Sequence, residues 1–336
     1  MDEQGSIGSP ERMRARGFTI MEFMIAMSLL AILMVGVMES FTFQQQTYTV
    51  VDQVAEAKQN VRVIADLIER EVRNAGYMVP ETATVCGADD TVGPDKLYVT
   101  DYSQIVSMSA MPTASLTRAL GAVVASPPVS GVGSGTQTIN VDTVDLDGLG
   151  GGPDFAVGAG VILADRNGAT TGVACGTVTA IGALGGASIP IGVDMEDSTG
   201  PLAGGTELVA VPAIVYEVNA QNQLLRNGVV LVNQVDDFQV AFFYDLNDDQ
   251  LIDPGEYIAD GIGGGDTYDA NSLDATLLRE VRINVIVRTR DEDPNRSWQE
   301  GIGQALENRT PASVAPVDGA RRRAHTSTVR LRNNVS

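Results

Sequence analysis

The sequence predicts an α+β fold in which one long N-terminal helix packs on an antiparallel β-sheet head. Three observations predict it. An apolar run extends from Phe18 to Met38 with one charged residue, helical periodicity then continues as far as Ala75, and short alternating segments separated by turn residues follow from Pro80 onward. The 336 residues leave room for a helical stalk and one or two modest domains.

A short basic leader precedes the apolar run. Arg12, Arg14 and Arg16 come before Gly17, and the apolar stretch that follows is long enough to cross a bilayer, which takes about 20 residues. An ordinary secretory signal has a shorter apolar core of about 7–15 residues and is cut after it. Positive charge before the span keeps the N-terminus in the cytoplasm, so we expect everything after about Met38 to lie outside the inner membrane.

Glu22 is the one charged residue between Phe18 and Met38. A carboxylate inside such a span costs about 2.5–3.5 kcal/mol, so the position indicates a function and the side chain needs a partner. If the chain is cut between Gly17 and Phe18, the new α-amino group lies one helical turn before Glu22 and needs a partner too. We therefore expect Glu22 to pair with this amine, on its own chain or on a neighbour.

The run RGFTIMEF, which contains Gly17, Phe18 and Glu22, resembles the cleavage and methylation signal of type IV prepilins and type II secretion pseudopilins. The resemblance implies that residues 1–17 are a leader, that a dedicated peptidase cuts after Gly17 and methylates Phe18, and that Glu22 guides subunit assembly. An ordinary signal anchor that happens to contain a glutamate is the alternative.

Beyond the membrane segment the helical pattern continues with one apolar face. Residues spaced three and four apart mark that face, namely Val54, Ala57, Val61, Ile64, Ala65, Ile68 and Val72. Gly76 is the expected C-cap, so the helix is predicted over residues 18–76, with residues 18–38 in the membrane or filament core. Its length is on the order of 85 Å. The segment Leu67–Tyr77 resembles the end of this helix in PilW-type minor pilins.

The rest of the chain is predicted to be a β-rich head in two parts. Residues 77–205 are rich in small residues and resemble no family that we identify, so we expect a variable β-rich insertion there. Residues 206–336 alternate more regularly, and their ending resembles the close of PilW-type chains, which implies a pilin-like antiparallel sheet. The expected strands are Lys96–Asp101, Thr138–Val144, Val157–Ala164, Gly172–Ile181, Glu207–Tyr216, Gln223–Arg226, Val235–Tyr244, Arg279–Arg290 and Thr326–Asn333.

Two cysteines, Cys86 and Cys175, lie in the segment that we place outside the membrane. That compartment permits disulfides, and a bridge that closes so long a loop stabilises a fold by a few kcal/mol. We expect a Cys86–Cys175 disulfide, with two separate buried thiols as the alternative. Two cysteines alone do not make a zinc site.

One acidic loop, Asp245–Glu256, has the ligand spacing of an EF-hand calcium loop. Leu251 offers a backbone carbonyl at position 7, and the oxygen donors at positions 1, 3, 5, 9 and 12 are Asp245, Asn247, Asp249, Asp253 and Glu256. Position 6 holds Gln250 in place of the usual glycine, and the flanks are predicted to be a strand and a turn. Calcium binding and a solvated acidic turn are both open, and the Asp-rich stretch that PilW-type chains often carry here favours calcium.

The charge and motif content limit the possible functions. A formal net charge of −21 argues against nucleic acid as a main partner, because phosphate binding needs Lys and Arg. The sequence has no zinc-protease helix motif, nucleophile elbow or phosphate loop, and its single histidine, His325, has no evident catalytic partner, so we expect no enzyme. The basic run Arg321–Arg323 is interpreted as a surface stripe or as a partner for acids of a neighbouring subunit.

Together these features predict a minor pilin of a type IV pilus, a structural subunit that primes or tips the filament through its N-terminal helix. We expect a single-pass inner-membrane protein with a periplasmic head that later reaches the pilus at the cell surface. Its expected partners are major and minor pilins, the prepilin peptidase and the inner-membrane assembly platform. Two alternatives remain: a type II secretion pseudopilin, and a membrane-anchored calcium-dependent adhesin.

Overall fold

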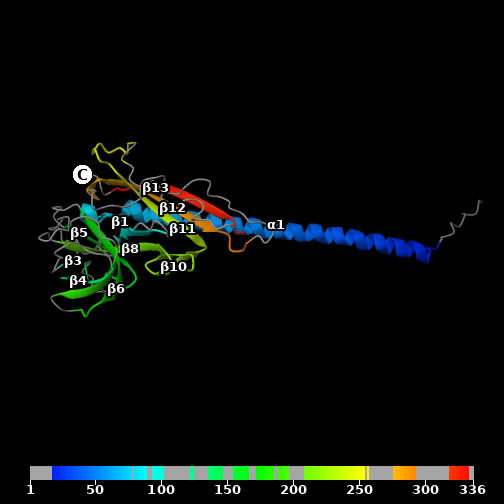
Figure 1. Ribbon diagram of the computed structural model, residues 1–336, viewed down its shortest axis with the longest axis horizontal. Helices are drawn as coiled ribbons and strands as arrows, with labels where there is room; N and C mark the ends of the chain where they lie inside the picture. The colour runs from blue at the N-terminus through cyan, green and yellow to red at the C-terminus, as the bar shows by residue number, and fades with distance from the viewer. Residues whose placement is uncertain are drawn as a thin grey trace, which may run out of the picture. The chain divides into compact units, whose positions relative to one another are not determined.

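The computed structural model describes residues 17–77, 79–88, 93–101, 122–124, 135–146, 154–165, 172–184, 188–196, 208–253, 256, 275–292 and 318–332. The chain divides into two compact units, Met1–Asp52 and Gln53–Ser336. One long helix is followed by two short 3-10 helices among the described residues and by antiparallel strands, so the predicted α+β class is confirmed. Figure 1 shows the long helix and the strands.

Helix α1 spans Ile20–Asn74. In the first unit every residue from Gly17 to Thr49 is exposed, whereas in the second unit one face of the helix is buried at the predicted spacing of three and four residues. The chain leaves the helix at Gly76, whose φ of +77° is the left-handed conformation that glycine adopts without strain. The predicted C-cap is therefore confirmed, and the helix begins two residues later than expected because Phe18 and Thr19 precede its first turn.

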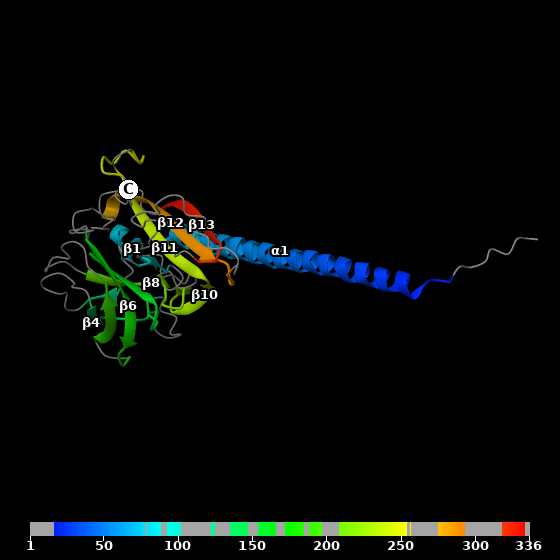
Figure 2. The same cartoon turned by 45° about the vertical axis from the view of Figure 1, so that its right-hand side comes forward.

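The buried face of α1 in the second unit packs on a three-stranded antiparallel sheet. The strands pair in the order β11 (Val235–Tyr244), β12 (Leu278–Arg288) and β13 (Arg322–Arg330), and both views show them alongside the helix (Figures 1 and 2). Alternate residues of the strands point at the helix and form one hydrophobic core with it. That core includes Ile64, Ile68, Val72, Phe238, Val240, Ile283, Val285 and Val329.

A buried carboxylate ties the same stretch of α1 to a second sheet. Glu71 is 8% exposed and accepts hydrogen bonds from the Tyr216 hydroxyl and from Arg226, whose Nη2 lies 2.8 Å from Glu71 Oε1. Burial raises the pKa of Tyr216, so its hydroxyl keeps its proton and donates a hydrogen bond to the carboxylate of Glu71. A buried carboxylate is tolerated only with such charged and polar donors around it.

The second sheet is organised around one long strand, β8 (Leu208–Val218). The C-terminal half of β8 pairs with β2 and β9, and its N-terminal half pairs with β5 and β3. The other strands of this sheet are β1 (Val85–Ala88), β2 (Lys96–Thr100), β3 (Ala122–Val123), β4 (Gly135–Val141), β5 (Gly160–Asp165), β6 (Val173–Ile181), β7 (Ile189–Met195), β9 (Gln223–Arg226) and β10 (Val229–Asn233).

Part of this sheet closes on itself as a small barrel. From β8 the pairing runs through β5, β6, β7 and β4, and a bridge between Val141 at the end of β4 and Val124 after β3 leads back to β8. The barrel encloses a hydrophobic core of its own, which includes Ile139, Val161, Leu163, Ile191, Val193 and Leu208. The segment predicted to be a β-rich insertion thus supplies most of a second core.

The strand predictions differ from the structure where the signal was short or where pairing extends a strand. β1, β3, β7 and β10 were missed, β13 begins at Arg322 rather than Thr326, and the expected strand Glu207–Tyr216 continues to Val218 as part of β8. β8 contributes Leu208 to the barrel core and Tyr216 to the core under α1. The expected boundary at residue 205 therefore falls just before a strand that both cores share.

Candidate functional site

The predicted cleavage site lies on an exposed segment before the first turn of α1. Gly17, Phe18 and Thr19 are outside regular secondary structure, and Phe18 is 88% exposed. Exposed, non-helical backbone is what a peptidase needs to reach a peptide bond. The structure therefore leaves the Gly17–Phe18 bond accessible.

Glu22 and Thr19 form a reciprocal cap at the start of α1. Glu22 Oε2 accepts hydrogen bonds from the Thr19 backbone N–H at 2.9 Å and from the Thr19 hydroxyl at 2.9 Å, and the Glu22 N–H donates to Thr19 Oγ1 at 3.3 Å. This arrangement is a capping box, which satisfies N–H groups that have no partner within the helix. Sequence reasoning missed Thr19, although the Thr-x-x-Glu spacing before an apolar run is the signal that identifies such a cap.

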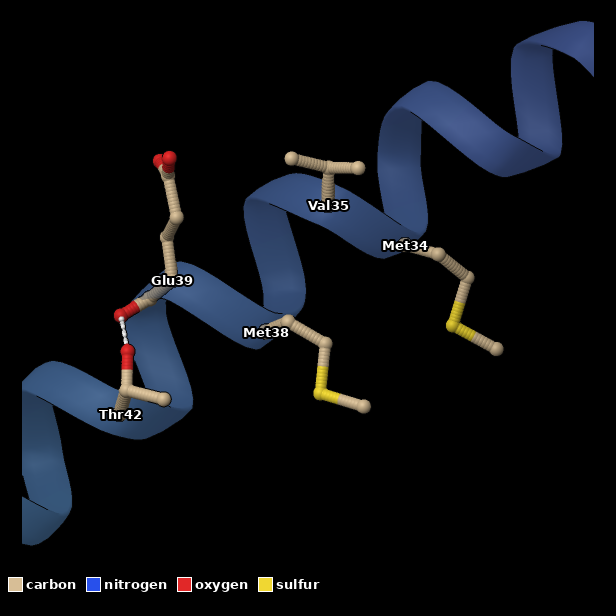
Figure 3. A pocket seen from close by; sticks show the side chains of 5 residues that line it. All are labelled: Met34, Val35, Met38, Glu39 and Thr42. Atoms are coloured by element: carbon tan, nitrogen blue, oxygen red, sulfur yellow. Dashed lines mark hydrogen bonds between the residues drawn. The ribbon is translucent and has the colours of Figure 1, made fainter.

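Among the described residues of the first unit, 17–52, nothing covers the helix behind this cap. Figure 3 shows one shallow hollow on this stretch, which is lined by Met34, Val35, Met38, Glu39 and Thr42 of α1. The large apolar residues from Phe18 to Met38 are 53–88% exposed. Among the residues described, α1 is the one helix that is long and apolar enough to cross a membrane. A continuous apolar surface of this kind needs lipid or other helices around it.

Asp245, at position 1 of the predicted calcium loop, is fully buried, and its carboxylate accepts hydrogen bonds from the loop backbone. Its carboxylate accepts the backbone N–H groups of Asp249 at 3.1 Å and Gln250 at 2.7 Å, and Arg279 Nε lies 3.4 Å away. Burial alone would raise the pKa of Asp245, but the backbone hydrogen bonds and Arg279 together lower it. Arg279 also pairs with Asp248 at 2.9 Å, so one arginine from β12 supplies positive charge to this loop.

Glu256, at position 12, folds back over the loop and accepts the N–H groups of Asn247 at 3.2 Å and Asp253 at 2.8 Å. Gln250, at position 6, has a φ of +67°, the left-handed conformation for which glycine is usual there. Leu251, which follows it, is 62% exposed. Among the described residues no three Asp, Glu, His or Cys side chains converge as metal ligands. The carboxylates of the described part of the loop accept backbone N–H groups of the same loop, and calcium binding stays a prediction.

Cys86 and Cys175 form a disulfide, with their Cα atoms 6.2 Å apart and both side chains buried. Cys86 lies on β1 and Cys175 on β6, and three strands, β2, β8 and β5, separate them along the sheet. The bridge therefore joins two strands that backbone hydrogen bonds do not connect. The alternative of two separate thiols is excluded, because neither cysteine is free.

The basic run Arg321–Arg323 is engaged within its own chain. Arg322 is fully buried, with Nη2 2.6 Å from Asp318 Oδ2 and Nε 2.6 Å from Asp236 Oδ2. Arg288 Nε lies 3.3 Å from the other oxygen of Asp236. The interpretation as a surface stripe or as a partner for a neighbouring subunit is wrong for Arg322, because a buried guanidinium needs carboxylates close by.

Comparisons with known proteins match both ends of the chain. Residues 12–38 match the prokaryotic N-terminal methylation motif, and residues 199–333 match the model of type IV pilus-assembly protein W. A solved structure, the type IV-like pilin TTHA1219 from Thermus thermophilus, is similar at a TM-score of 0.34 and 11% identity over 84% of this chain and 99% of that one. No curated protein matches the chain. The two family matches confirm the resemblance to type IV prepilins and PilW-type minor pilins, and they support a pilus-related structural subunit.

Proposed function

We propose that this chain is a minor pilin of a type IV pilus, which primes or tips the filament through its N-terminal helix. The observation that carries the proposal is the combination of an accessible Gly17–Phe18 bond with a capped, fully exposed apolar helix behind it. A matching model of the pilus-assembly protein W over residues 199–333 points to the pilus rather than to another machine. The large, two-core head argues against a major subunit, whose heads must pack in many copies.

Assembly in this proposal follows from the geometry at Glu22. Both hydrogen bonds from Thr19 use Oε2, which leaves Oε1 for a cation. Leader removal creates that cation at the amine of Phe18, on the same chain or on a neighbour. A carboxylate and an amine are both costly in an apolar surrounding, so their pairing favours the assembled state.

The partners and location follow from the same features. The prepilin peptidase acts on residues 17 and 18, other pilins surround the apolar helix, and the inner-membrane assembly platform moves the subunit into the fibre. The basic leader holds the N-terminus in the cytoplasm, so the head is periplasmic until the subunit reaches the pilus.

The experiment that tests this proposal is deletion and complementation in the native host. A strain that lacks the chain is expected to lose surface pili and twitching while its exoprotein secretion continues, and the wild-type chain restores both. Glu22→Ala is expected to fail, whereas Glu56→Ala, which removes an exposed acid further along the helix, is expected to restore pili. Loss of secretion with normal pili contradicts the proposal in favour of the pseudopilin alternative.

We further propose that the loop Asp245–Glu256 takes up Ca²⁺. Gln250 supports this, because its left-handed backbone provides at position 6 the sharp turn that glycine provides in calcium loops. Glu256 supports it too, since it already reaches positions 3 and 9. Calcium in the periplasm would then compete with Arg279 for Asp245. A calcium-dependent adhesin remains the alternative. If the chain is such an adhesin, the head binds a surface only when Ca²⁺ is bound in this loop.

A further inference from the structure

The outermost strand of the three-stranded sheet is β13, which is drawn in red in Figure 1. Its nine residues pair with β12 in one continuous register, without a bulge. Among the described residues no strand pairs with the other edge of β13. A long, regular edge presents a row of backbone N–H and C=O groups, which is a template on which another strand can pair.

The hydrogen bonds at the two ends of β13 show which of its residues face this open edge. The Leu331 N–H donates to the Arg279 carbonyl at 2.9 Å. The Thr289 N–H donates to the Arg321 carbonyl at 2.9 Å. In an antiparallel ladder alternate residues bond to the same neighbour, so the odd-numbered residues of β13 bond to β12 and the even-numbered residues face outward. The exposed residues among the latter are Ala324, Thr326, Thr328 and Arg330.

Two arginines, Arg323 and Arg330, lie near the two ends of this edge. Arg323 Nη1 donates to the Arg322 carbonyl at 2.8 Å, and Arg330 Nη2 donates to the Gln250 carbonyl at 2.8 Å. Both acceptors are neutral, and among the described residues no carboxylate forms an ion pair with either arginine. Residues 319–336 contain no acid at all. Seven residues of a strand span about 23 Å, so two uncompensated positive charges flank the edge at that distance.

These charges distinguish the strands that can add to the edge. A second copy of β13, paired antiparallel, brings Arg330 of each chain to the level of Arg322 and Arg323 of the other, and like charges across a strand pair are destabilising. Arginine on an open edge thus prevents identical chains from pairing. A neutral strand makes the backbone bonds but leaves both charges uncompensated. At physiological salt, charges beyond about 8 Å are screened, so these two arginines outweigh the distant acids of the head.

We infer that the outer edge of β13 is a site of strand addition, which takes an extended segment of another protein with an acidic residue at each end. The outward backbone groups at Thr326 and Thr328 supply the hydrogen bonds, and Arg323 and Arg330 select the acidic ends, which lie seven residues apart in the added strand. This surface is on the head and uses neither the processed N-terminus nor the apolar helix, so the inference goes beyond the proposed function.

The test measures binding of labelled peptides to the purified full-length chain in detergent micelles by fluorescence anisotropy at physiological salt. The probe is a peptide with a glutamate at each end and six alternating valine and threonine residues between them. The glutamate peptide is expected to bind about tenfold more tightly than the same peptide with lysine at each end. The glutamate peptide methylated on its internal amide nitrogens is expected to show no measurable binding, because it cannot pair as a strand.

The matched variants are Thr326→Pro and Thr326→Val. Both lose the hydrogen bond from the Thr326 hydroxyl to Asn284 Oδ1, which is 2.7 Å long, but only proline removes the outward N–H. Proline is tolerated on an edge strand whose N–H faces solvent, so the pairing with β12 is expected to persist. Thr326→Pro is expected to bind the glutamate peptide about tenfold more weakly than the wild type, whereas Thr326→Val binds it within about twofold.

Three results overturn the inference. A wild-type chain that binds neither peptide, or binds the glutamate and lysine peptides equally, has no edge selective for acidic strands. Unchanged binding of the methylated peptide excludes strand addition, and this result does not depend on whether Thr326→Pro folds. A wild-type dimer in light scattering that Thr326→Pro abolishes assigns the edge to a second copy. The assay needs neither leader cleavage nor a pilus, so its failure is distinguishable from failure of the piliation test.

Discussion

The Cys86–Cys175 disulfide is predicted to supply a large share of the stability of the head. Its two cysteines are 89 residues apart in the sequence. Closing a loop of that length removes chain entropy from the unfolded state that corresponds to about 4.6 kcal/mol at 25 °C. The free energy of unfolding of native domains is about 5–15 kcal/mol. The loss of this bond therefore removes a large part of it and is expected to bring the head close to unfolding.

The perturbation is the double variant Cys86→Ala/Cys175→Ala. Alanine is chosen because both sites are buried and a serine hydroxyl would need a partner there. Urea unfolding followed by circular dichroism gives the free energy of unfolding by linear extrapolation. We expect a loss of about 4.6 kcal/mol or more relative to the oxidised wild type, and reductant is expected to weaken the wild type but not the variant. A difference below about 1 kcal/mol between the unfolding free energies of the two proteins contradicts this prediction. The disulfide would then not lower the entropy of the unfolded chain by the amount that its loop length predicts.

Three further predictions concern the buried charges and the acidic loop. Arg322→Met leaves Asp236 and Asp318 without their shared guanidinium, so the free energy of unfolding is expected to fall by about 3–5 kcal/mol in the same urea assay. An unchanged urea midpoint contradicts the view that this ion-pair cluster stabilises the head. The hydrogen bond from Arg322 lowers the pKa of Asp318 in the folded state. Its contribution to stability is therefore fully present above the ordinary aspartate pKa of about 4, and it is lost as the pH falls from there through the lower pKa of the folded state. The stability difference between wild type and Asp318→Asn is therefore expected to shrink below pH about 4 in thermal unfolding, and a constant difference argues against the pair. Calcium titration by calorimetry is expected to show that the wild type binds Ca²⁺. Asp249→Asn is expected to weaken this binding, whereas Asp142→Asn, outside the loop, is expected to leave it unchanged. A wild type that releases or absorbs no heat on calcium addition contradicts the calcium proposal.

The helix and its signals could be predicted because they depend on local sequence. The three- and four-residue spacing of Val61, Ile64, Ile68 and Val72 fixed which face of α1 is buried, and Gly76 fixed where it ends. The processing motif is contiguous, so its residues could be named without a structure. Thr19 was equally accessible to sequence reasoning, since its spacing to Glu22 is that of a capping box.

The barrel could not be predicted, because it depends on which strands pair. β8 looks like an ordinary buried strand, yet its two halves contribute to different cores. Among the described residues, the sheet returns to β8 through the Val124–Val141 bridge and the pairing of β3 with β8. Arg322 was missed for a similar reason. An arginine in a basic run is normally solvated, and its burial follows from Asp236, 86 residues away in the sequence.

If this chain enters a pilus, its N-terminus is processed first, and mass spectrometry of the intact chain and of its N-terminal peptide detects that processing. The chain is co-expressed with a prepilin peptidase, and the same preparation without the peptidase is the control. We expect a mature chain that begins at Phe18 with a methylated amine. A chain that still begins near Met1 in both preparations contradicts the account and directs attention to an anchored adhesin.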